Sequence, residues 1–302
     1  MSNQYRKVLI GSILLIATFF CVFIVLIDPK YKHQFKPQLS AFKYNPINGE
    51  RIFNASGCSS CHLDSDGSAS SLVLAGGLAL KTDFGTFYSP NISPHKIYGI
   101  GSWTIKNFSD AVRNGISPDK DHYFPSFPYN SYQDMTDEDL VDLYYFLMSL
   151  NSSEKRNKTH EMSFPFTFRG PVGLWKQLYF YPNKKDSAKK TEGQYLVEAL
   201  GHCAECHTPR NIFGALDNKR FLAGAKSIKN KGAAPNITPH KTGIEHWTVE
   251  DIVNYLDTGF TPDFDSAGGQ MVSVITNLSK LPKKDLVEIA KYLKSVRPVA
   301  SN

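Results

Sequence analysis

The feature that most constrains this chain is a motif, Cys-x-x-Cys-His, that begins at Cys58 and again at Cys203. Two thiols about one helical turn apart can form thioether bonds with the two vinyl groups of one haem. The histidine that follows can supply an axial imidazole to the iron. The spacing therefore predicts two covalently bound haem c groups. The residues predicted to hold them, two thiols and one imidazole for each haem, are Cys58, Cys61, His62, Cys203, Cys206 and His207.

Two other uses of paired cysteines compete with haem attachment. Two such pairs can bind zinc, and a single pair can act as a redox disulfide. Neither use requires a histidine directly after the second cysteine. A zinc ribbon also brings its pairs together over roughly fifteen to twenty residues, whereas Cys58 and Cys203 lie 145 positions apart. Haem attachment is therefore the favoured interpretation.

An uncharged apolar run near the N-terminus extends from Val8 to Ile27, directly after Arg6 and Lys7. About twenty apolar residues suffice to span a bilayer as a helix. A cleaved signal peptide is the alternative, but the run is longer than a usual signal core and no small-x-small cleavage site follows it. We therefore expect an uncleaved transmembrane anchor with Cys21 inside the bilayer. Because c-type haem is attached outside the bacterial cytoplasm, the rest of the chain should lie on the periplasmic side of the inner membrane.

The cysteine motif is part of a longer internal repeat. The segment 90–96, Pro-Asn-Ile-Ser-Pro-His-Lys, recurs almost unchanged at 235–241, and Trp103-Thr104 recurs as Trp247-Thr248. Apolar residues at helical spacing follow each threonine, so both threonines are predicted N-caps. Such a duplication predicts two similar structural units.

Strand-forming patterns are scarce, so the sequence predicts a mainly α-helical protein in which short helices and loops surround each haem. The predicted segments are a transmembrane anchor at 1–28, a tether at 29–47, a first haem domain at 48–150, an aromatic and basic connector at 151–190, and a second haem domain at 191–298.

The sixth ligand of each iron is predicted from the few methionines. Met271 follows a flexible Gly-Gly loop in the second unit, and Met135 stands in the corresponding place in the first, before the final helix. A thioether on the second axial position suits electron transfer, whereas an open position invites other chemistry. Met135 and Met271 are therefore the predicted ligands. The residues that compete for the first iron are Met148, His95 and His122, and His240 is the repeat partner of His95.

Charge is distributed unevenly along the chain. Residues 48–150 carry 6 Lys and Arg against 12 Asp and Glu, whereas the connector 151–190 carries 9 against 3. No basic patch with interleaved aromatic residues is present, so nucleic-acid binding is not expected. An acidic first unit should attract a basic soluble acceptor through long-range attraction. We expect Asp137, Glu138 and Asp142 to contribute to that docking and the donor to engage the second unit and the connector.

Several segments outside the motif carry a resemblance to a known family. They are Gly85 to Ile92, Phe127 to Tyr132, Gly201 to Arg210 and Gly268 to Met271. With them, the chain resembles the membrane-anchored multihaem cytochrome c subunits of periplasmic alcohol, sorbitol and gluconate-type dehydrogenases. The resemblance implies two tandem class I-like cytochrome c domains behind the transmembrane helix.

The same resemblance implies a function in electron transfer. Electrons would enter from a dehydrogenase catalytic subunit and leave towards a quinone, a soluble cytochrome or a terminal oxidase of the respiratory chain, and the chain alone would not be an enzyme. The known alcohol and gluconate subunits carry three haem motifs, whereas this chain has two. A dihaem peroxidase-like enzyme and a haem-based sensor are the alternatives. The methionines in both units argue against a peroxidase, and no signalling domain follows either unit.

Overall fold

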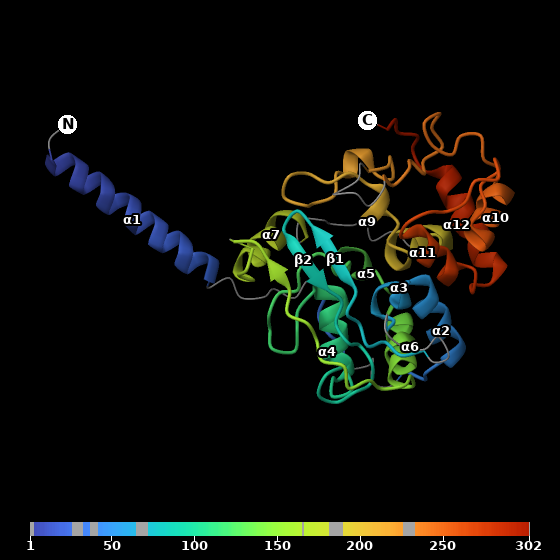
Figure 1. Cartoon of the computed structure of the whole chain (residues 1–302), viewed down its shortest axis with the longest axis horizontal. Helices are drawn as coiled ribbons and strands as arrows, with labels where there is room; N and C mark the ends of the chain where they lie inside the picture. Colours follow the sequence, from blue (N-terminus) through green and yellow to red (C-terminus); the bar gives the residue numbers. More distant parts are fainter. Residues whose placement is uncertain are drawn as a thin grey trace.

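The computed structural model describes residues 3–25, 33–36, 42–64, 72–164, 166–180, 190–225 and 233–301. Parts of the predicted tether 29–47 and residues 181–189 of the predicted connector lie outside the described residues. Figure 1 shows a long helix, α1 (Asn3–Val25), that projects away from a mainly helical body. The mainly α-helical prediction is confirmed.

Helix α1 has the length and composition of a membrane-spanning segment. Residues Gln4–Phe23 have a mean hydropathy of 2.0, and none of that stretch is buried in the fold. At 1.5 Å per residue a helix of this length extends about 30 Å, the thickness of a bilayer's hydrocarbon core. An apolar helix at this end of a chain fits either a membrane anchor or a signal sequence.

The first repeat is built on two crossed helices, α2 (Pro46–Ala55) and α6 (Asp137–Met148). They cross at Gly49, where a Cβ would collide with the backbone oxygen of Asp142. The short helical elements between them in sequence are α3 (Cys58–His62), α4 (Ile105–Ser109), the π-helical η2 (Asp110–Asn114) and α5 (Tyr129–Tyr132).

The second repeat has the same plan. Its opening helix, α8 (Glu192–Tyr195), is continued by the π-helical η3 (Leu196–Leu200) and crosses the final helix, α12 (Lys283–Ser295). A Cβ on Gly193 would collide with the backbone oxygen of Glu288, as at Gly49. The elements between them are α9 (Ala204–His207), the 3₁₀ turn η4 (Asn218–Arg220), α10 (Val249–Thr258) and α11 (Met271–Leu278).

The predicted helix starts are confirmed at both repeats. The hydroxyl of Thr104 accepts from the backbone N–H of Asn107, and the Asn107 side chain accepts from the Thr104 backbone in return. Thr248 and Asp251 form the same reciprocal pair at the start of α10. Each such capping box pairs backbone donors that a helix start leaves unsatisfied. Pro282 directly precedes α12.

A small antiparallel sheet was not predicted. Strands β1 (Ala79–Thr82) and β2 (Gly85–Tyr88) form a hairpin, and β2 also pairs with β3 (Glu161–Met162). Since β3 belongs to the connector, this sheet attaches the connector to the first repeat. The connector also contains helix α7 (Gly170–Tyr179), which contacts α1.

One hydrophobic core runs through both repeats. It contains Ile52 and Leu140 from the first repeat together with Leu196 and Leu286 from the second. Figure 1 accordingly shows the blue and green helices of the first repeat beside the orange and red helices of the second. The two repeats therefore share one hydrophobic core instead of each having its own.

Candidate haem sites

The first motif presents His62 in a form ready to bind a metal. His62 is the last residue of α3, and its Nδ1 lies 2.8 Å from the backbone oxygen of Pro90. Because a carbonyl oxygen only accepts hydrogen bonds, Nδ1 must carry the proton, which leaves the lone pair on Nε2. A hydrogen bond of this kind orients the ring and fixes the tautomer in histidines that ligate metals.

The second motif repeats this arrangement. Nδ1 of His207 lies 2.8 Å from the backbone oxygen of Pro235, again 28 residues further along the chain. Burial lowers the pKa of His62 and of His207, and the hydrogen bonds to the prolines oppose that shift only in part. Both imidazoles are therefore held neutral, which is the protonation state that binds iron. The donor set of each site fits a haem.

The thiols lie in surroundings that do not favour zinc. Burial, with a nearby Cys61 as the second cause, raises the pKa of Cys58 to about 12. Burial and Cys206 do the same for Cys203. Zinc binds the thiolate form. Among the described residues no three His, Cys, Asp or Glu side chains gather as a metal site, so the two cysteine pairs do not converge as a zinc ribbon requires.

Both predicted methionine ligands pack into the hydrophobic core that also receives Cys58 and Cys203. Met135 lies in the turn before α6, is only 3% exposed, and its backbone oxygen accepts from Arg113 at 2.7 Å. Met271 is half-buried and begins α11 directly after the Gly-Gly loop. This placement is compatible with iron ligation, which stays a prediction for both residues.

The competing histidines have other roles in the structure. Nδ1 of His95 accepts from the backbone N–H of Tyr98 at 3.1 Å, and Nδ1 of His240 accepts from Thr242 at the same distance. Both histidines therefore stabilise the repeated Pro-rich turn. His122 is buried and pairs with Ile116 in an isolated bridge. Met148 is the last residue of α6 and packs against the core.

The first cysteine motif contacts helix α11 of the second repeat, which no pattern in the sequence indicated. The hydroxyl of Ser59 in the first motif lies 2.5 Å from the side-chain oxygen of Asn277 in α11. The amide nitrogen of Asn277 donates to the hydroxyl of Ser60 at 2.8 Å. Met271 is the first residue of α11. The first cysteine motif therefore contacts the helix that carries the predicted ligand of the second iron.

Tyr132 links the segments that directly precede the two motifs. Its hydroxyl donates to the backbone oxygen of Ser56, just before the first motif, at 2.9 Å. Its ring meets the ring of His202, just before the second motif, with 5.5 Å between centroids. The ion pair between Arg51 of α2 and Asp285 of α12, at 2.5 Å, ties the repeats together further. These contacts fix the two sites relative to each other.

Two of the three carboxylates expected to attract a partner to the first repeat, Asp137 and Asp142, are engaged internally, whereas Glu138 is exposed. Burial raises the pKa of Asp137, but hydrogen bonds from Lys36 and Arg113 outweigh it and hold that pKa below its ordinary value. Asp142 is buried and accepts from the backbone of Asn45 at 2.8 Å and from the side chain of Asn48. Negative charge counted along the sequence therefore overstates what this repeat presents to solvent.

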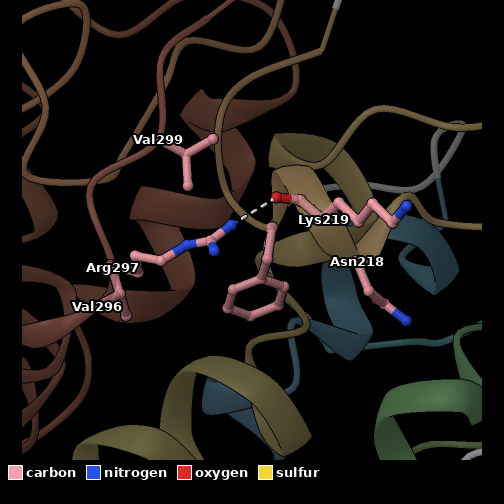
Figure 2. A pocket seen from close by; sticks show the side chains of 6 residues that line it. Asn218, Lys219, Val296, Arg297 and Val299 are labelled. Atoms are coloured by element: carbon pink, nitrogen blue, oxygen red, sulfur yellow. Dashed lines mark hydrogen bonds between the residues drawn. The ribbon is translucent and has the colours of Figure 1, made fainter.

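One surface pocket lies away from these residues. It is formed by η4 and the segment after α12, and its lining comprises Asn218, Lys219, Phe221, Val296, Arg297 and Val299. Figure 2 shows the Arg297 side chain reaching across it to donate to the backbone oxygen of Lys219 at 2.9 Å. None of the predicted haem residues lines this pocket.

Comparison with known proteins agrees with the geometry. The profile of the cytochrome c family matches residues 47–151. A diheme cytochrome c-type protein of Cereibacter sphaeroides is 50% identical over 253 residues, which cover 82% of this chain and 84% of that protein.

Other relatives are named as parts of dehydrogenases. A nicotinate dehydrogenase subunit of Pseudomonas putida is 38% identical over 82% of this chain, and the fructose dehydrogenase cytochrome subunit of Gluconobacter japonicus is 36% identical over 85%. The chain spans 21% of the first of these proteins and 54% of the second. Both therefore contain extensive sequence outside the matched region.

Proposed function

This chain belongs to the cytochrome c family, and on that premise we propose that it conducts electrons from a dehydrogenase to a respiratory acceptor through two haems, one in each repeat. Haem c supplies reversible one-electron chemistry when bound. The observation that carries the proposal is the doubled histidine geometry, with His62 and His207 each donating through Nδ1 to a prolyl carbonyl at 2.8 Å. The dihaem relative supports the same count.

Equivalent residues would hold the haem in each repeat. Cys58 and Cys61 would form the thioether bonds of the first haem, and Cys203 and Cys206 those of the second. The neutral imidazoles of His62 and His207 would bind iron through Nε2. Thioether ligation on the opposite side, by Met135 and Met271, would close the iron to outside ligands, which favours electron transfer over peroxide chemistry.

The packing between the repeats supports passage of electrons from one site to the other. Ser59 and Ser60 contact Asn277 on the helix that begins with Met271. Tyr132 lies between the residues that precede the two motifs. A fixed, closely packed interface keeps the distance between two redox centres constant. We therefore describe the chain as one conduit of two cytochrome c domains, approximately residues 48–150 and 191–298, joined by a connector at 151–190.

The electron donor is proposed from the relatives and the location from α1. Relatives named as cytochrome subunits of fructose, gluconate and alcohol dehydrogenases support a dehydrogenase catalytic subunit as the donor. The acceptor would be a quinone, a soluble cytochrome or a terminal oxidase. We propose that α1 and its flanks, residues 1–28, anchor the chain in the inner membrane through the tether 29–47, with both haem domains in the periplasm.

Visible spectroscopy on membranes of the producing bacterium tests this function. Nicotinate, fructose, gluconate and ethanol, added separately, are expected to include a substrate that reduces the chain's haem, and the double variant C203A/C206A should lose part of that signal. A chain that dithionite reduces but that stays oxidised with every dehydrogenase substrate of the organism would contradict the proposed donor. A chain without covalent haem would contradict the function as a whole.

A further inference from the structure

A nine-residue turn has the same backbone in both repeats, at residues 115–123 and 259–267. The last backbone N–H of each turn returns to the carbonyl of its first glycine at 2.8 Å, from Tyr123 to Gly115 and from Ala267 to Gly259. The residue at the tip has a positive φ in both turns, 66° for Lys120 and 63° for Phe264. The two turns therefore differ in their side chains rather than in their shape.

In the first repeat the connector covers the base of this turn. Lys176 of α7 donates from Nζ to the backbone oxygens of Asn114 and Gly115, both at 2.7 Å. Beside it, Ile116 is completely buried and the tip of the turn carries the exposed Lys120. The chain thus contains its own example of a helix docked on this turn through a lysine side chain.

In the second repeat the same turn presents apolar side chains to solvent. Phe260, at the position of Ile116, is 53% exposed, and Phe264 at the tip is 91% exposed. Val272, at the start of α11, is 50% exposed. Three exposed carboxylates flank these side chains, those of Asp257, Asp263 and Asp265. We call these six residues the open face.

None of the described residues buries the two phenylalanines of this turn. A positive φ is unfavourable for a bulky side chain, and a phenyl ring left in water forgoes the free energy of burial. Lys120 shows that the turn forms equally well with a polar residue at its tip. Exposed apolar side chains interspersed with carboxylates fit a protein interface instead, where an apolar centre is bordered by polar residues.

We propose that the open face is the docking surface for a redox partner protein with an apolar contact centre ringed by lysine or arginine side chains. The proposal rests on the proposed function, since Val272 directly follows Met271, the predicted ligand of the second iron. A partner docked there lies beside the second haem site. The carboxylates disfavour an anionic membrane surface as the occupant, and the α7 of a second copy is already buried against its own first repeat.

A matched pair of variants in the two turns tests the docking surface. Asp263 and Asp265 of the open face correspond to Asp119 and Asp121 of the first repeat, and all four carboxylates are exposed. The probe is a basic mitochondrial cytochrome c, oxidised, mixed by stopped flow with the reduced full-length chain at low salt. D263N/D265N, and separately F264K, should lower the second-order rate constant about fivefold or more, since charges at a docking rim act mainly on association. D119N/D121N should change it less than about twofold.

Several results would overturn the docking surface. Equal effects of D263N/D265N and D119N/D121N on the rate constant would mean that only the overall charge of the chain matters. An unchanged rate constant in F264K would show that Phe264 is not part of the contact. A loss of self-association or of binding to anionic vesicles in F264K, without a change in electron transfer, would assign the face to another occupant. Haem content and reduction by dithionite are measured on every variant. A wild-type chain that transfers electrons while its variants do not differ would refute only this inference and leave the proposed function intact.

Discussion

The two repeats share the same helical framework and differ in whether another segment of the chain packs on the nine-residue turn. Each has a histidine that is hydrogen-bonded to a prolyl carbonyl and a glycine where its first and last helices cross. Each also has a threonine capping box, at the start of α4 in the first repeat and of α10 in the second. On the first repeat, α7 closes the turn at Gly115, whereas the turn at Gly259 is left open with two exposed phenylalanines. The difference separates the residues that hold the frame from those that select partners.

The two repeats also differ in how their carboxylates are used. In the first repeat Asp137 and Asp142 are bonded to neighbouring segments of the chain and contribute to folding, whereas Asp119 and Asp121 are exposed. In the second repeat Asp257, Asp263 and Asp265 are exposed around apolar side chains. Unpaired carboxylates in solvent attract a basic partner over a distance, whereas carboxylates paired with cations contribute little to the electric field around the protein. The net charge of a repeat is therefore a poor guide to its docking surface.

The largest effect is expected from exchanging the predicted methionine ligands. Met271→His should lower one of the two reduction potentials and Met135→His the other, by an amount on the order of 0.1–0.3 V, because axial ligands set haem potentials over a range of about 0.8 V. Redox titration followed by visible absorbance measures both potentials. Met148→Leu, at the end of α6, is the control and should change neither. If Met135→Ala leaves both haem spectra intact, the first iron has another ligand, and His122 is the next residue to replace.

A smaller effect is expected from removing the cover of the first repeat. Lys176→Met should destabilise the chain by about 2 kcal/mol at pH 9, because the buried carbonyl oxygen of Asn114 loses its lysine donor and that of Gly115 keeps only the N–H of Tyr123. Lys120→Met, on the same turn but exposed, should change the free energy of unfolding by less than about 0.5 kcal/mol. Urea unfolding of the haem-loaded chain measures both. Equal stability of wild type and Lys176→Met would show that α7 does not stabilise this face.

The stability difference between wild type and Lys176→Met should also depend on pH. Burial lowers the pKa of Lys176 to about 7 from its ordinary 10.5. Between these values the unfolded chain binds more protons than the folded chain, so stability rises with pH across that window. Wild type should therefore gain stability relative to the variant from about pH 7 to about pH 10.5. A flat difference over this range would mean that the buried amine keeps its ordinary pKa.

The smallest effect tests whether the shared frame is equally important in both repeats. Thr104→Ala and Thr248→Ala each remove the hydroxyl of a capping box and should each cost about 1 kcal/mol. Thr258→Ala, an exposed threonine at the end of α10, serves as the control. Urea unfolding monitored by circular dichroism gives the three values. Costs that differ by more than about 1 kcal/mol would show that the two caps, although alike in geometry, support unequal structures.

Local features of the fold were predictable from the sequence. Thr104 and Thr248 cap helices because an N-cap depends on residues within one turn of each other, and the apolar run 8–27 reads directly as a helix. The sheet was not predictable, since β3 at Glu161 pairs with β2 across a long stretch of chain. The same reason hid the docking of Lys176 on Asn114.

The candidate site was predictable in its parts but not in its arrangement. The motif Cys-x-x-Cys-His by itself predicts haem attachment. The internal repeat showed that Pro90 and Pro235 occupy equivalent positions after the two motifs. The contact of Ser60 with Asn277 joins residues more than two hundred positions apart, and neither residue type signals such a partner. The burial of Asp142 was equally hidden, because sequence composition counts charges without their partners.

The number of covalent haems per chain, measured by pyridine haemochrome absorbance against protein concentration, decides whether both motifs hold a haem. We expect two haems in the denatured wild type and one in either C58A/C61A or C203A/C206A. The two double variants should be alike in this respect, because each removes one member of the same repeated site. A wild-type count of one, or an unchanged count in either double variant, would contradict the assignment of one haem to each motif.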